Sequence, residues 1–82
     1  MDLKQEIVAA LQSGSDHHAL MEIVYRHCQR GLTDREAYVA LEAVWRDLGF
    51  QDSDAESAQR DELEFVMERV WYFGATASQR TA

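Results

Sequence analysis

The sequence predicts an all-α protein, folded as a compact four-helix antiparallel bundle or as a three-helix core with an N-terminal arm. The 82 residues include no proline, and apolar residues recur at the spacings of three and four that mark one face of a helix. Each of the four glycines follows such a segment, where a residue that tolerates the left-handed conformation ends a helix at low cost. No segment shows the alternation of a strand. Four glycine stops therefore predict four helices.

The first helix is expected from about Asp2 to Ser13, with an inward face of five residues: Leu3, Ile7, Val8, Ala10 and Leu11. It is short, which is why a loosely docked arm is the alternative. Ser15 or Asp16 is expected to cap the second helix, which runs to about Arg30. Its inward residues are expected to be Leu20, Ile23, Val24 and His27.

The third helix has the clearest start, because Thr33 and Glu36 can form a capping box. It is expected to end near Leu48, with one apolar face formed by Ala37, Tyr38, Leu41, Val44, Trp45 and Leu48. Phe50 follows Gly49, at the position where a helix ending places an apolar side chain against one five residues earlier. A contact between Phe50 and Trp45 is therefore predicted.

The fourth helix is expected to open with a second capping box, Ser53 to Glu56, and to end near Phe73. Its core stripe is expected to be Leu63, Val66, Met67, Val70 and Phe73. Residues 1–74 are then a single helical domain, and residues 75–82 a flexible C-terminal tail.

This last helix has too many large apolar side chains for one buried face. Phe65 and Tyr72, seven residues apart, point away from the core stripe and share their side with carboxylates. An aromatic pair framed by acids is typical of a protein interface. The predicted partner-binding residues are Asp61, Glu64, Phe65, Glu68 and Tyr72. The alternative is that another element of the chain covers the two rings.

The charge is acidic, −7 from 15 acids and 8 bases. Residues 52–69 alone hold seven acids and two arginines, a balance of −5. Because a nucleic-acid binder usually needs the opposite sign, we expect no nucleic acid as partner and favour a basic protein. Plain solubility would also explain the acidity.

The localisation expected from the sequence is cytoplasmic. No apolar run approaches the roughly 20 residues needed to span a bilayer, so no membrane partner is expected. The N-terminus carries charges of both signs and does not look like a signal peptide. One cysteine, Cys28, excludes an internal disulfide and agrees with a reducing compartment.

No enzymatic chemistry is expected, and no metal or cofactor. His17 and Cys28 are eleven positions apart, about 16 Å along one helix, which is too far to share a metal ion. The neighbours His17 and His18 are expected to diverge by about 100°. The segment from Ser13 to His17 has the letters of a serine hydrolase, but it lies at a helix junction where serine and aspartate act as caps.

The function expected from these features is that of a small acidic binding module or inhibitor, which presents the acidic and aromatic helix face to a basic protein. In size, charge and helix number the chain resembles the immunity proteins that neutralise bacterial nucleases, which implies an antagonist. The resemblance includes no motif, so no residue role follows from it. The alternative is a homodimeric structural or assembly protein with the same face buried between two copies.

Overall fold

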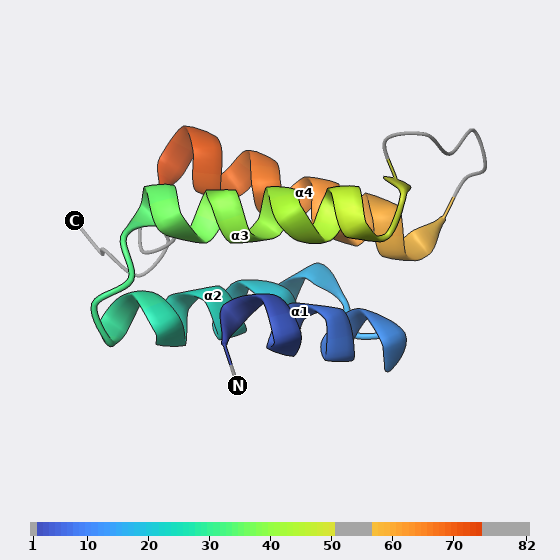
Figure 1. Cartoon of the computed structure of the whole chain (residues 1–82), viewed down its shortest axis with the longest axis horizontal. Coiled ribbons are helices and arrows are strands. Elements are labelled where there is room, and N and C mark those ends of the chain that lie inside the picture. The colour runs from blue at the N-terminus through green and yellow to red at the C-terminus, as the bar shows by residue number, and fades with distance from the viewer. Residues whose placement is uncertain (1, 51–56, 75–82) are drawn as a thin grey trace.

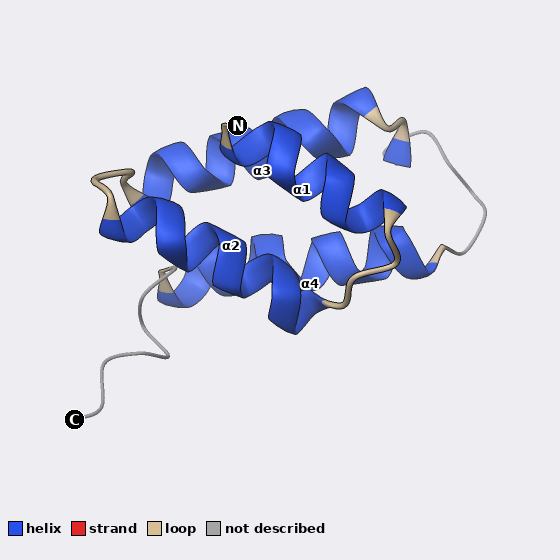
Figure 2. Cartoon of the chain, turned by 90° about the horizontal axis from the view of Figure 1, so that it is seen from below, coloured by secondary structure: helices blue, strands red, loops and turns tan. Residues whose placement is uncertain are grey.

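Four helices form the part of the chain that the structure, a computed structural model, describes: residues 2–50 and 57–74 (Figure 1). They are α1 (Leu3–Gln12), α2 (His17–Gln29), α3 (Asp34–Asp47) and α4 (Ala58–Phe73). Successive helices run in opposite directions, and α1 and α2 form a layer beneath α3 and α4. All regular structure in these two ranges is helical (Figure 2), which confirms the all-α bundle.

Each helix begins at a side chain that accepts a hydrogen bond from a backbone N–H of the first turn. The four capping residues are Asp2, Asp16, Thr33 and Ser57. Thr33 and Glu36 form the predicted capping box. The start of the last helix was predicted too early, because Ser57 lies outside the helix and caps it. The predicted box from Ser53 to Glu56 lies outside the described residues.

The helix ends agree with the glycine pattern, since all four glycines have a positive φ. At the end of α2, Gly31 has a φ of 115°, and the Leu32 N–H donates a hydrogen bond back to the His27 carbonyl. At the end of α3, Gly49 turns the chain so that the rings of Phe50 and Trp45 meet edge to face, 5.4 Å between centroids. The predicted contact of these two rings is confirmed.

The core lies between the two layers and receives three buried apolar side chains from every helix, together with Phe50. They are Leu3, Ile7 and Leu11 of α1, Leu20, Ile23 and Val24 of α2, Ala37, Leu41 and Val44 of α3, and Leu63, Val66 and Val70 of α4. Because α1 buries as many residues as the others and packs on α2 and α3, it is a full member of the bundle and no loose arm.

Two residues predicted in the core are exposed. Leu48 follows the last residue of α3 and is 36% exposed. Phe73, in the last turn of α4, is 63% exposed, and its ring lies beside the Arg69 guanidinium. Among the described residues, no helix is long and apolar enough to cross a membrane.

Candidate functional site

The outer face of α4 carries the predicted partner-binding residues Asp61, Glu64, Phe65, Glu68 and Tyr72. Tyr72 is 72% exposed and Phe65 41%. Two rings that the prediction did not place here, Trp71 and Phe73, are also exposed. Four aromatic side chains of α4 therefore face solvent.

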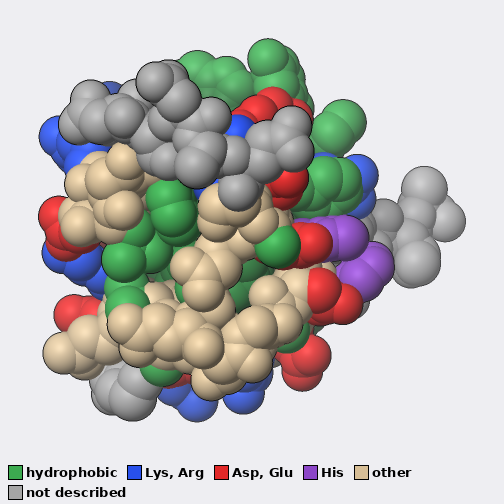
Figure 3. Space-filling view, turned by 90° about the vertical axis from the view of Figure 1, so that its right-hand side faces the viewer, with side chains coloured by type: hydrophobic (Ala, Val, Ile, Leu, Met, Phe, Trp, Pro, Cys, Tyr) green, Lys and Arg blue, Asp and Glu red, His purple; other side chains and the backbone are tan. Residues whose placement is uncertain are grey.

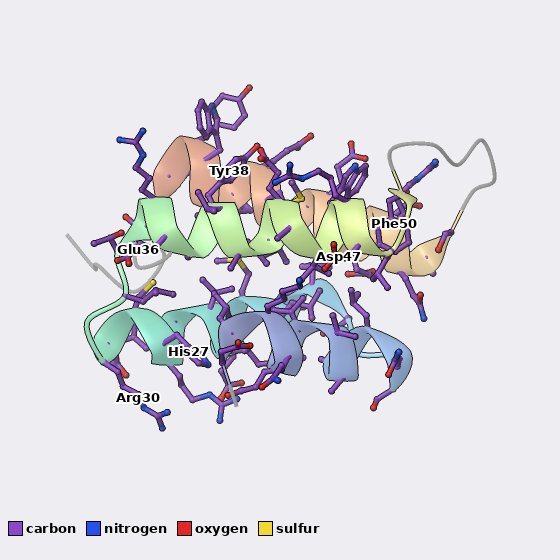
Figure 4. The ribbon with its side chains drawn as sticks, viewed as in Figure 1. His27, Arg30, Glu36, Tyr38, Asp47 and Phe50 are labelled. Carbon is purple, nitrogen blue, oxygen red and sulfur yellow. The ribbon has the colours of Figure 1, made fainter. Side chains whose placement is uncertain are left out.

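Part of this face borders a hollow of about 320 Å³ between α3 and α4, which we call the α3–α4 hollow. Its lining consists of Tyr38 and Trp45 from α3, and Glu64, Met67, Glu68, Trp71 and Tyr72 from α4. The rings of Tyr38, labelled in Figure 4, and Trp71 lie 5.0 Å apart and are inclined by 48°. Two carboxylates and no basic side chain line this hollow.

The remaining part of the α4 face turns toward α2. The Arg69 guanidinium lies over two rings, 5.7 Å from the centroid of Phe65 and 5.3 Å from that of Phe73. Phe65 also contacts the His17 ring, with 4.3 Å between the ring centroids. Glu64, Glu68 and Tyr72 line the hollow, whereas Phe65 packs toward α2 and Asp61 lies outside the hollow lining.

A histidine pair at the start of α2 lies against α4. His17 Nδ1 is 2.7 Å from Glu62 Oε2, and the same oxygen accepts the His17 backbone N–H. The rings of His17 and His18 lie 4.2 Å apart, so the expectation that they diverge was wrong. Their Cα–Cβ bonds diverge, but the side-chain torsions bring the rings together. Histidine and acidic side chains meet at the surface in Figure 3. Through these two contacts with His17, Glu62 of α4 links that helix to the N-terminus of α2.

A second histidine ties α2 to α1. His27 Nε2 lies 3.0 Å from Glu6 Oε1, and the His27 side chain is 15% exposed. The hydrogen bond with His27, helped by the charges of His27 and Arg26, lowers the pKa of Glu6 and outweighs the opposing effect of desolvation. Because its side chain is mostly buried and contacts the neighbouring helix, His27 has a structural role here.

Three arginines belong to the last turns of α2 and the first turn of α3, and we call them the arginine end: Arg26, Arg30 and Arg35. All three are exposed. Arg26 and Arg30 are one helical turn apart on α2, and Figure 4 shows Arg30 projecting from the end of that helix. Arg35 lies in the first turn of α3, across the tight turn at Gly31.

The lone lysine of the chain, Lys4, lies in the first turn of α1. Its Nζ forms an ion pair with Asp47 Oδ2 at the end of α3. Asp2, two residues before Lys4, caps α1 by accepting the Gln5 N–H at 2.8 Å. Both carboxylates therefore already have a structural partner.

A comparison with protein families identifies this chain. The model of the PD-(D/E)XK nuclease superfamily matches residues 2–82. Because the match spans nearly the whole chain, the protein belongs to the PD-(D/E)XK nuclease superfamily. Searches of curated proteins and of solved structures gave no significant match.

Membership of a nuclease superfamily overturns three predictions. The function predicted from sequence, an acidic protein-binding inhibitor or a homodimeric assembly protein, was wrong. So were the expectations that the chain has no enzymatic function and that nucleic acid is not a partner. The reasoning failed because a net charge sums the whole surface and does not show where individual cations lie. Nucleases also commonly use carboxylates to hold divalent metal ions, so acidity does not exclude the activity.

The described residues do not fit such a metal centre. The motif spelled out in the superfamily's name ends in an acidic residue, any residue and lysine, and Asp2-Leu3-Lys4 has that spacing. Asp2, however, is the N-cap of α1 and accepts the Gln5 N–H, whereas Lys4 forms an ion pair with Asp47. Among residues 2–50 and 57–74, no three His, Cys, Asp or Glu side chains are grouped to hold a metal ion. The acids at 52, 54 and 56 lie outside this range.

Sequence reasoning missed the α3–α4 hollow and the arginine end. For the hollow a signal was present, because Tyr38 and Trp45 are seven residues apart, as are Glu64 and Trp71, so each pair shares one helix face. Which faces meet depends on how α3 packs on α4, and the sequence does not supply that. The arginine end was missed because the prediction used the net charge of the chain, which is negative.

Proposed function

We propose that the protein acts on nucleic acid in a nuclease reaction, in which the helical bundle holds the phosphate backbone. The observation that carries the proposal is the superfamily match over residues 2–82. Since the described residues do not fit a metal centre, the role proposed for them is binding of nucleic acid, with no step of bond cleavage assigned to them.

The arginine end is the surface proposed to contact phosphate. Guanidinium groups donate paired hydrogen bonds that match phosphate oxygens, and exposed arginines account for much of the affinity of proteins for nucleic acid. Arg30 and Arg35 form no ion pair with a carboxylate within the described residues. Both guanidinium groups are therefore available to an external anion.

Carboxylates also lie near these arginines. Asp34 and Glu36 are in the first turn of α3, on either side of Arg35. Together with the overall charge of −7, they predict a low affinity for nucleic acid and a strong dependence of that affinity on salt.

Two measurements test this proposal. The first is cleavage of labelled single-stranded and duplex DNA and RNA by the purified protein with Mg²⁺, with EDTA as the control. The second is fluorescence anisotropy of the same strands over a salt series. Three phosphate contacts to duplex DNA predict a slope of log K against log salt of about −2.7. The variant with Arg26, Arg30 and Arg35 changed to Gln is expected to lose this binding.

The matched control is Arg46→Gln, since Arg46 is exposed on α3 and pairs with Glu42. It is expected to leave binding unchanged. Absence of both cleavage and salt-dependent binding would contradict the proposed function. Binding that is retained in the triple variant would place nucleic acid elsewhere on the surface.

Residues 1–74 are proposed to act as one domain, since all four helices share a single core. The cytoplasm is the proposed compartment, supported by the lone Cys28, which is a free thiol.

A further inference from the structure

The proposed binding of nucleic acid at the arginine end involves none of the residues that line the α3–α4 hollow. Tyr38 and Trp71 form an angled pair of rings, with Trp45 and Tyr72 as further aromatic walls. Trp71 is 66% exposed and Tyr72 is 72% exposed, although most large aromatic rings in a small bundle are buried. At 5.0 Å the rings of Tyr38 and Trp71 contact each other, so a ligand in the hollow would meet the ring surfaces that this contact leaves open.

The charged side chains that line the hollow are both acidic. Glu64 and Glu68 are one helical turn apart on α4, and neither forms a hydrogen bond or ion pair with another described residue. Two carboxylates at this spacing repel each other and destabilise the helix that carries them. Arg69, which follows Glu68 on α4, lies over the rings of Phe65 and Phe73. No cation of the described chain therefore lines the hollow.

We propose that the α3–α4 hollow binds a small organic cation, such as a quaternary ammonium compound or a protonated amine. Aromatic faces and carboxylates both attract positive charge, and an aromatic cage is the usual protein site for a quaternary ammonium group. A bound cation would also relieve the repulsion between Glu64 and Glu68. The volume of about 320 Å³ lies at the lower end of the range of small-ligand pockets.

The same features argue against other occupants. A phosphate-bearing ligand would meet Glu64 and Glu68 without a basic side chain to receive it. A neutral apolar ligand would fit the rings but leave the two carboxylates unpaired. The cation is the one class of small ligand for which both the rings and the charges are favourable.

Intrinsic fluorescence gives a direct assay, because Trp45 and Trp71 are the two tryptophans of the sequence and both line the hollow. Choline is the probe, and 3,3-dimethyl-1-butanol is its uncharged counterpart of the same shape. Choline is expected to change the emission saturably, and the neutral alcohol is expected to bind at least roughly tenfold more weakly. Equal binding of the two, or no saturation with choline below about 10 mM, would overturn the proposal.

Variants locate the site. Replacing Glu64 and Glu68 together by Gln is expected to weaken choline binding by roughly tenfold, since each exposed charge contact contributes a few-fold. Asp61→Asn is the matched control, because Asp61 is exposed on α4 but does not line the hollow. It is expected to change the affinity less than about twofold. Equal effects of the two changes would mean that general acidity, and no defined site, attracts the cation. Circular dichroism of each variant checks that the fold is kept.

Discussion

Replacing Leu41 by alanine tests the packing of the bundle. Leu41 is fully buried in α3, the helix that packs against both α1 and α4. Removing three side-chain carbons there leaves a cavity, and such changes cost about 2.7 to 5 kcal/mol in well-packed cores. A chain of 82 residues has a total stability of about 4 to 12 kcal/mol. We therefore expect a loss of about 3 kcal/mol, a large share of the whole.

The assay is urea unfolding followed by circular dichroism, in which this loss would lower the midpoint by about 1 to 3 M. Val39→Ala is the matched control, because Val39 is on the same helix but 56% exposed. It should shift stability by less than about 0.5 kcal/mol. A cost below about 1 kcal/mol for Leu41→Ala, or a cost equal to that of Val39→Ala, would refute the packing described here.

Three further predictions concern caps and titratable groups. Asp16→Ala should cost about 1 kcal/mol in the same urea assay, because Asp16 caps α2, whereas Glu22→Ala at an exposed position within α2 should not; equal costs would show that the cap contributes nothing. The pKa of Glu6 is lowered in the folded protein, so its contribution to stability is present above its ordinary pKa of 4.5 and is lost as the pH falls further. Glu6→Gln should flatten this acid side of the stability curve, and an unchanged curve would contradict the pairing with His27. Burial, and to a lesser extent the charge of Asp34, raises the pKa of the Cys28 thiol. Iodoacetamide at pH 8 should therefore alkylate Cys28 more slowly in the native protein than in the urea-unfolded protein. Equal rates would show an unperturbed thiol.

The helices of this fold could be predicted from local signals. The Thr33–Glu36 box and the glycine after each helix act within a few residues, so the sequence shows them directly. The errors in the predicted fold concern the start and the end of the last helix. Ser53 and Ser57 both have the chemistry of a cap, and the structure places Ser57 at the start of α4. Phe73 fits the apolar period but lies one turn beyond the point where the stripe still faces the core.

The sites depend on packing between helices and were harder to predict. Glu64, Glu68 and Tyr72 were selected from α4 alone, yet the hollow they border is completed by Tyr38 and Trp45 of α3. The ring contact of His17 with Phe65 likewise joins two helices that are far apart in the sequence. Helical periodicity gives the face of one helix, but not the neighbour that it meets. The superfamily itself came from the family comparison, because no local motif pointed to it.

The central claim is that this superfamily member binds nucleic acid through the arginine end. Amide chemical-shift mapping of the ¹⁵N-labelled protein, titrated with a short DNA duplex and with its single strand, tests that claim most directly. We expect the largest shifts around Arg26, Arg30 and Arg35, with little change at Glu64 and Glu68. Shifts concentrated at the α3–α4 hollow, or no shifts with either strand at low salt, would contradict it.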